Sequence, residues 1–174
     1  MRRIIIWLIA LSLCAVLSCT KNDDEPANGM YVDLGLTSGT KWKTLNEVNT
    51  ANAESSYFSY FEAADQFGDK LPTLEQWIEL FNECSWTWTG MGCKVVGSNG
   101  NSITLPAMGM RHSDNTSELQ VGWAGCYWFY TTSIDSLNMP AFHFYENSNP
   151  AGVGSSISRL YTSFYRRSVR LVQD

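Results

Sequence analysis

The chain has 174 residues, of which 44% are hydrophobic and 17% charged, and its net charge at pH 7 is −5. This composition is that of a globular protein and excludes an intrinsically disordered chain. The acidic balance, with no basic cluster before the extreme C-terminus, argues against a nucleic-acid partner. The length leaves room for one domain with a substantial core.

The first residues have the polarity of an export signal. Arg2 and Arg3 precede an apolar run over residues 4–16, which is shorter than the about 20 residues that a membrane-spanning helix needs. Residues 16–19 read VLSC, with a small residue directly before Cys19, and resemble the lipobox of bacterial lipoproteins. We therefore predict a signal peptide over residues 1–18 and a lipid on Cys19. The alternative is an ordinary signal peptide followed by an incidental cysteine.

A polar segment follows Cys19. Residues 20–26, TKNDDEP, are acidic and end in proline, which is typical of a solvated tether. We predict a flexible tether over residues 19–30 and a single domain over residues 31–174. The tether also resembles the Lys-plus-acidic stretch of surface-exported lipoproteins in the Bacteroidetes, which implies display on the cell surface from the outer membrane. If the segment is only a spacer, attachment to the periplasmic face of the outer membrane is equally compatible with the sequence.

The domain is predicted to begin with two short strands, over residues 31–36 and 41–43, and to continue with two helices. Aromatic residues at helical spacing predict a first helix over residues 57–67, ended by Gly68. Thr73 and Gln76 form a capping-box pattern in front of an apolar stripe, which predicts a helix over residues 74–83.

Period-two alternation then predicts strands over residues 85–89, 94–96, 102–105, 127–131, 141–145 and 168–172. Asn99-Gly100 predicts a hairpin, and a two-residue turn there would place Val96 opposite Ile103. In the last strand we expect Val169 and Leu171 to point one way and Arg170 the other. Residues 147–156 read as a polar loop. Two helices early in the chain, short antiparallel strands and long loops together define an α+β domain.

Five stretches in one order carry a resemblance to a known family. They are YVDLGLTSGTKW at 31–42, LPTLEQW at 71–77, CSWTW at 84–88, GSNGNSITLPAMG at 97–109 and SVRLV at 168–172. Together they resemble the Fibrobacter succinogenes major paralogous domain, which is common in surface lipoproteins of gut Bacteroidetes. The resemblance covers residues 31–172. It implies a C-type-lectin-like fold, related to formylglycine-generating enzymes and to the variable proteins of diversity-generating retroelements.

The chain departs from the family pattern in two places. Residues 127–130 read YWFY where the family usually has Tyr-Trp-Ser-Ser, and residues 165–167 read YRR where it has a glycine-aromatic lead-in to the last strand. These departures mark the positions at which this chain would differ from its relatives in what it binds.

The cysteines and histidines give little support to catalysis. After the predicted signal and lipid site, Cys84, Cys93 and Cys126 remain, so a Cys84–Cys93 disulfide and three free thiols are both compatible with the sequence. Formylglycine-generating oxidase chemistry needs a late cysteine pair, which Cys126 alone cannot supply. His112 and His143 lie 31 residues apart, and we interpret His112 as a polar loop residue.

A metal or acid/base site also finds little support. No His, Cys or carboxylate set has metal-ligand spacing, and we expect no cofactor. The loop residues Asp114 and Asp135 could bind structural calcium, although the dense Asp/Asn-Gly calcium loop is absent. Carboxylates of an acid/base pair need not be close in sequence, so a dispersed site stays open.

Residues 123–165 are rich in aromatic side chains between Asn, Ser and Gly. Tyr and Trp give contact area at low entropic cost, and Ser and Asn supply adaptable hydrogen bonds. Alternation places about half of these aromatic residues in the core. The candidate ligand-binding residues are Trp123, Tyr127, Trp128, Tyr130, Tyr145, Asn147, Asn149, Tyr161, Tyr165 and Arg166.

The expected function is therefore recognition of a glycan or protein ligand by a non-catalytic module anchored to the outer membrane. The alternatives are an extracytoplasmic enzyme with a dispersed acid/base site, and a structural subunit of a surface appendage.

Overall fold

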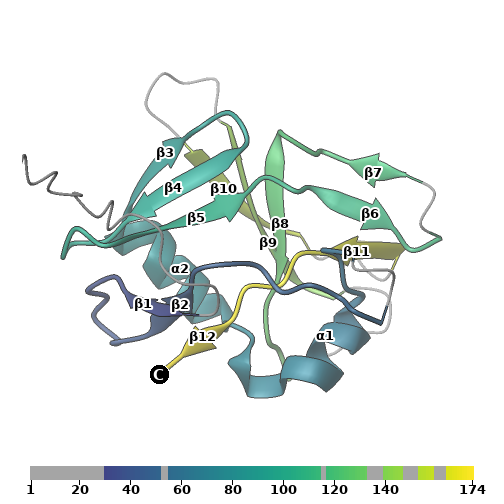
Figure 1. Ribbon diagram of the computed structural model, residues 1–174, viewed down its shortest axis with the longest axis horizontal. Helices are drawn as coiled ribbons and strands as arrows, with labels where there is room; N and C mark the ends of the chain where they lie inside the picture. Colours follow the sequence, from purple (N-terminus) through teal and green to yellow (C-terminus); the bar gives the residue numbers. More distant parts are fainter. Residues whose placement is uncertain (1–29, 52–54, 115–116, 133–138, 147–152, 159–163) are drawn as a thin grey trace, which may run out of the picture.

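The computed structural model of the chain describes residues 30–51, 55–114, 117–132, 139–146, 153–158 and 164–174. The described residues form a mixed α/β domain with two α-helices and twelve short strands. The strands make four three-stranded sheets, and all pairings within them are antiparallel (Figure 1). None of the helices in these ranges is long and apolar enough to cross a membrane.

The sheets combine strands that are close and far apart in sequence. The first has β2 (Lys41–Lys43) between β1 (Tyr31–Asp33) and β12 (Val172–Gln173), so it joins the two ends of the described domain. The second is the meander β3 (Ser85–Trp88), β4 (Gly92–Val96) and β5 (Ser102–Pro106). The third has the order β11 (Tyr165–Arg167), β6 (Met110–His112) and β7 (Glu118–Leu119). The fourth has the order β10 (Val153–Ser158), β9 (Ala141–Glu146) and β8 (Ala124–Trp128).

Both helices begin with a complete capping box. In α1 (Tyr60–Phe67) the Ser59 side chain accepts from the Glu62 backbone, and in α2 (Leu74–Glu83) Thr73 accepts from Gln76. The helix predicted over residues 74–83 is confirmed, and α1 ends before Gly68, whose φ is 51°. The prediction of two helices early in the chain is wrong, because both lie between residues 60 and 83 and follow β1 and β2. A 3₁₀ turn, Gly68–Lys70, connects them.

The core has two aromatic-rich clusters. In the first, Trp77 of α2 lies 4.7 Å from Trp42 and stacks on Phe142 at the same centroid distance. This cluster also takes in buried side chains of β4 and β5, so α2 connects the first, second and fourth sheets (Figure 1). In the second, Trp128 of β8 packs edge-on against Tyr60 of α1. Burial of such large apolar areas is the main stabilising term of the fold.

The C-terminal segment differs from the strand predicted over residues 168–172. Only Val172–Gln173 forms a strand there, and Arg170 is fully buried together with Val169 and Leu171. The guanidinium of Arg170 donates to the backbone oxygens of Lys43 and Thr104 at 2.7 and 2.8 Å, and to Asn46 Oδ1 at 2.9 Å. These three acceptors explain why a cation is tolerated inside, where alternation alone predicts the opposite face.

The β4–β5 hairpin has a longer connection than predicted. Residues 97–101 form it, with Gly97 N–H donating to Asn101 O, so Val95 rather than Val96 lies opposite Ile103. The predicted register is wrong because the turn has five residues and not two.

The predicted polar loop over residues 147–156 overlaps β10. Opposite Tyr145 in the pairing of β10 with β9 is Gly154. A Cβ at residue 154 would come within 2.4 Å of Tyr145 Cε2, so the glycine lets the tyrosine ring cross the strand.

Candidate functional site

An open cleft of about 630 Å³ lies beside the β10-β9-β8 sheet. This volume is within the range of ligand pockets, about 300–1,000 Å³. The aromatic side chains of Trp123 and Tyr145 line it, and the polar residues around them are Gln120, His143, Glu146 and Ser156. We call this feature the aromatic cleft.

The alternation of β9 separates the cleft from the core. Phe142 and Phe144 point into the first core cluster, while His143 and Tyr145 face the cleft. On the partner strand β10, Ser156 lies opposite His143. One strand therefore supplies both the interior of the domain and the floor of the candidate site.

A tight turn presents Trp123 at the rim. Gln120 has a φ of 61°, which is rare for a residue other than glycine, and its carbonyl accepts from the backbone N–H groups of Trp123 and Ala124 at 3.0 Å. Glu146 N–H donates to Trp123 O, so the end of β9 is tied to the same turn. The indole that results is 74% exposed, the most exposed of the tryptophans that the structure describes. Backbone geometry thus holds a large aromatic side chain in solvent.

The cleft carries little charge. Burial, and to a lesser extent the charge of Arg167, lower the pKa of His143 to about 4, so its ring is neutral at pH 7. Glu146 is then the one charged side chain among the described residues that line the cleft. A ligand in the cleft would contact hydrogen-bonding groups and aromatic surface rather than a cluster of charged side chains.

A Cys–His pair lies beneath the cleft but lacks the properties of a nucleophilic site. Cys126 is opposite His143 in the β8–β9 ladder and donates to Gln120 Oε1 at 3.8 Å. Burial raises the pKa of Cys126 to about 12, so the group is a thiol at neutral pH, whereas the attacking species is the thiolate. The arrangement of this pair therefore favours packing over covalent catalysis.

The cysteines of the domain are free. Cys84, Cys93 and Cys126 are unbridged, so of the two states open from the sequence the structure has the one with three thiols. Burial raises the pKa of Cys84 to about 11, and of Cys93 and Cys126 to about 12.

This burial predicts slow modification of the three thiols in the native protein. At pH 8, unfolding returns each thiol to its ordinary pKa of about 8.5 and provides the reactive thiolate. We expect a thiol-reactive disulfide reagent to modify the protein rapidly in denaturant and slowly in buffer. Rapid native modification of Cys93 and Cys126, the two fully buried cysteines, would contradict this expectation.

Metal ligands are sparse around these features. Within the described ranges, no group of three or more His, Cys, Asp or Glu side chains is placed to hold a metal ion. Of the two aspartates considered for calcium, Asp114 lies 2.8 Å from His112 Nδ1, and Asp135 is outside the described residues.

The structure describes seven of the ten residues predicted to bind a ligand, and it brings two of these seven together. Trp123 and Tyr145 line the aromatic cleft. Tyr127 and Trp128 are fully buried, so their interpretation as surface contacts is wrong. The ring of Tyr127 is held by hydrogen bonds to Asn46 and to Pro106 O, and the Trp128 indole donates to Phe58 O at 2.8 Å.

Three further predicted residues that the structure describes do not line the cleft. Tyr130 is half-exposed just beyond β8, where its N–H donates to Pro72 O. In β11, the Tyr165 ring packs edge-on against His112, and Arg166 forms an ion pair with Glu62 of α1 at 2.6 Å. Asn147, Asn149, Tyr161 and Cys19 lie outside the described residues.

The sequence did not identify the four polar residues of the cleft, namely Gln120, His143, Glu146 and Ser156. The alternation of residues 141–145 placed His143 away from the core and so carried a signal for the cleft face. Glu146 and Ser156 depend on the pairing of β9 with β10, and Gln120 on a turn with unusual backbone geometry. Neither feature has a local sequence pattern.

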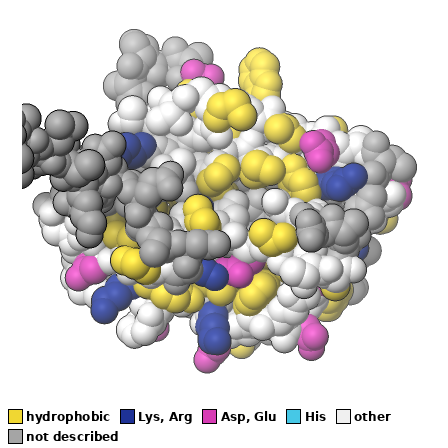
Figure 2. Space-filling model, viewed as in Figure 1, with side chains coloured by type: hydrophobic (Ala, Val, Ile, Leu, Met, Phe, Trp, Pro, Cys, Tyr) yellow, Lys and Arg dark blue, Asp and Glu magenta, His cyan; other side chains and the backbone are white. Residues whose placement is uncertain are grey.

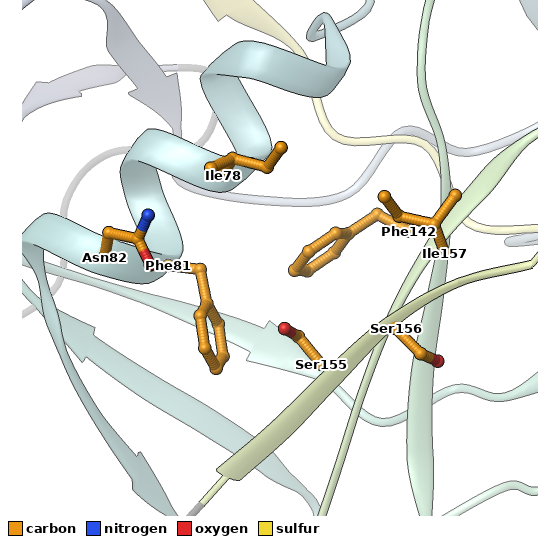
Figure 3. Close-up of a pocket in the computed structure, with 7 residues that line it drawn as sticks. All are labelled: Ile78, Phe81, Asn82, Phe142, Ser155, Ser156 and Ile157. Carbon is orange, nitrogen blue, oxygen red and sulfur yellow. The ribbon is translucent and has the colours of Figure 1, made fainter.

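A second, smaller cavity lies on the opposite face of the same sheet. It has a volume of about 200 Å³ and is bounded by Ile78 and Phe81 of α2, Phe142 of β9 and Ser155 and Ile157 of β10. Figure 3 shows the Phe81 and Phe142 rings flanking it, with Ser155 between them on β10. Its volume is below the usual range for ligands, so we regard it as a gap at the margin of the core.

On the face that Figure 2 shows, the described charged side chains do not gather into a patch of one sign. Hydrophobic side chains there are scattered among polar ones, and acidic and basic residues are interspersed.

Comparisons with models of protein families, with curated proteins and with solved structures found no match.

Proposed function

We propose that the chain is a membrane-anchored lipoprotein, displayed on the cell surface, whose domain recognises a glycan or protein ligand without catalysis. The observation that carries the proposal is the aromatic cleft, on which the exposed Trp123 and Tyr145 converge. Exposed aromatic rings among adaptable polar groups are the composition of recognition surfaces.

The polar groups of the cleft favour binding over hydrolysis. Glycoside hydrolysis uses two carboxyl groups about 5–10 Å apart. Among the described residues that line the cleft, Glu146 is the single carboxylate. Two other carboxylates, Glu79 and Glu83, accept hydrogen bonds from Ser38 and Thr37, which gives them a structural role between α2 and the β1–β2 connection.

The fold that we propose for the domain is C-type-lectin-like. In support, the domain is small, has two helices in its described part and short antiparallel strands, and pairs its first and last strands through β2. An experimental structure that retained these pairings but superposed poorly on C-type-lectin-like domains would contradict this assignment.

Ligand binding is expected to depend on Trp123. Screens of a glycan array and of candidate partner proteins should find a ligand whose affinity falls about 10-fold or more in Trp123→Ala, because an exposed aromatic anchor is lost. The stability of this variant should change by less than about 0.5 kcal/mol.

Phe61→Ala provides the matched control. Phe61 is 57% exposed on α1, which packs against Trp128 at the far end of β8 from Trp123. Its removal should leave the affinity unchanged. Equal binding by wild type and Trp123→Ala would refute the cleft as the recognition site.

Anchoring is expected to depend on Cys19. Cys19→Ala should abolish metabolic labelling with an alkyne fatty acid and release the protein from membranes, because the lipid chains supply the attachment. Cys14→Ala is the control and should stay labelled, since residue 14 lies in the predicted signal. Labelling that persists in Cys19→Ala would contradict the anchor, and protease treatment of intact cells tests display on the surface.

A further inference from the structure

We infer that the aromatic cleft binds an uncharged sugar ring, stacked on the indole of Trp123 and hydrogen-bonded by the polar residues around it. The inference rests on the proposed function and names the ligand class of the same site. Three properties of the described residues lead to it, namely the placement of the aromatic rings, the charge of the lining and the kind of polar groups present.

The aromatic rings provide a stacking surface. The Trp123 indole stands 74% exposed at the rim, and Tyr145, on the neighbouring strand, is 39% exposed. Because Gly154 has no side chain, the Tyr145 ring lies across β10 and widens the apolar wall. The face of an aromatic ring is electron-rich. A pyranose presents C–H groups on one face, which complement such a surface, and hydroxyl groups at its edge.

The charge of the lining selects against anionic ligands. The described residues that line the cleft include no lysine or arginine, and the one charged side chain among them is the carboxylate of Glu146. His143 adds no positive charge, because its ring is neutral at pH 7. A sulfate, phosphate or uronic acid would therefore meet like charge with no basic partner, whereas a neutral sugar meets no such penalty.

The polar groups match hydroxyl groups in kind. The Gln120 amide both donates and accepts, the Ser156 hydroxyl does the same, and the Glu146 carboxylate accepts. A sugar hydroxyl can use all three. Calcium-mediated recognition would need a shell of six to eight oxygen ligands, and this lining offers one carboxylate, so stacking and direct hydrogen bonds are the means of recognition.

The competing ligand class is an organic cation, for example a trimethylated lysine. Such a cation would also favour an aromatic face and one carboxylate. Cation recognition by this means uses an aromatic cage, whereas the cleft is open, large for one ammonium group and lined by two aromatic rings with neutral polar groups between them. The geometry therefore favours the sugar.

The test uses the full chain, extracted in a detergent without a sugar headgroup and measured in parallel with and without EDTA. Tryptophan fluorescence is titrated with neutral gluco-, manno-, galacto- and xylo-oligosaccharides, with polygalacturonate fragments and with a trimethyl-lysine peptide. We expect saturable binding of at least one neutral oligosaccharide, about 10-fold or more weaker in Trp123→Ala and unchanged in Phe61→Ala. The bound sugar should also protect Trp123 from quenching by acrylamide.

Three results would overturn the inference. They are tighter binding of the acidic fragments or the peptide than of any neutral sugar, sugar binding that EDTA abolishes, and sugar binding that Trp123→Ala leaves intact. If a protein ligand binds in a Trp123-dependent way while the neutral sugars do not, the sugar inference fails and the recognition proposal survives. If the ligands found depend on no cleft residue, both fail.

Discussion

Replacing Trp128 with alanine is expected to lower the free energy of unfolding by about 3–5 kcal/mol, the usual cost of truncating a buried tryptophan. The indole is completely buried, its Nε1 donates to Phe58 O at 2.8 Å, and its ring packs edge-on against Tyr60. The guanidinium carbon of Arg167 lies 4.4 Å from the centroid of the Trp128 ring. Truncation would remove the ring from both contacts and leave a cavity beneath α1.

Such a loss is a large part of the about 5–15 kcal/mol that stabilises an ordinary domain. Urea unfolding, followed by far-UV circular dichroism, measures it as a shift in midpoint at constant slope. Trp123→Ala removes the same side chain from an exposed position and should cost less than about 0.5 kcal/mol. Comparable losses in the two variants would contradict the assignment of Trp128 to the core and Trp123 to the surface.

Replacing Arg170 with methionine is expected to cost a similar amount, about 3–5 kcal/mol. Methionine retains much of the length of the side chain but has no donor. The variant would leave two backbone oxygens, those of Lys43 and Thr104, and the Asn46 side chain without their guanidinium partner. These acceptors lie in β2, in β5 and in the segment after β2. Loss of the hydrogen bonds from Arg170 would therefore weaken the contact between the first and the second sheet.

Thermal and urea unfolding of Arg170→Met measure this cost, with Lys94→Met as the control. Lys94 is an exposed cation in β4, and its replacement should change stability by less than about 0.5 kcal/mol. An Arg170→Met protein within about 1 kcal/mol of wild type would show that the buried guanidinium does not bridge the sheets.

The elements that could be predicted from the sequence are those whose signals are local. Helix α2 follows from the Thr73–Gln76 capping box and an apolar stripe, and the capping box and the helix are confirmed. The stripe predicted its buried face only in part, because Trp77 is buried as expected while Ile78 is 43% exposed and Leu80 is buried in its place. The register of β4 with β5 was wrong by one residue, because the length of the connection depends on Gly97 and Asn101 and not on Asn99-Gly100 alone. Strand β10 was missed because its small polar residues become a strand only through pairing with β9.

The candidate site shows the same limit. The aromatic content of residues 123–165 predicted a binding surface there. A strand with one buried face and a strand buried on both faces can have the same sequence pattern, and in β8 all five residues are buried. Tyr127 and Trp128 were therefore assigned to the surface in error. The burial of β8 results from the first core cluster on one side and α1 with Arg167 on the other, and these partners are remote in sequence.

The most direct test of the recognition site uses the tryptophan indole N–H resonances of ¹⁵N-labelled protein during titration with the ligand found in the screens. The Trp123 resonance is assigned by its loss in Trp123→Phe. The cleft account predicts that this resonance shifts with saturation, while those of the fully buried Trp42, Trp77 and Trp128 remain in place. A saturable shift of the other indole resonances with that of Trp123 unmoved would place recognition elsewhere and contradict the account.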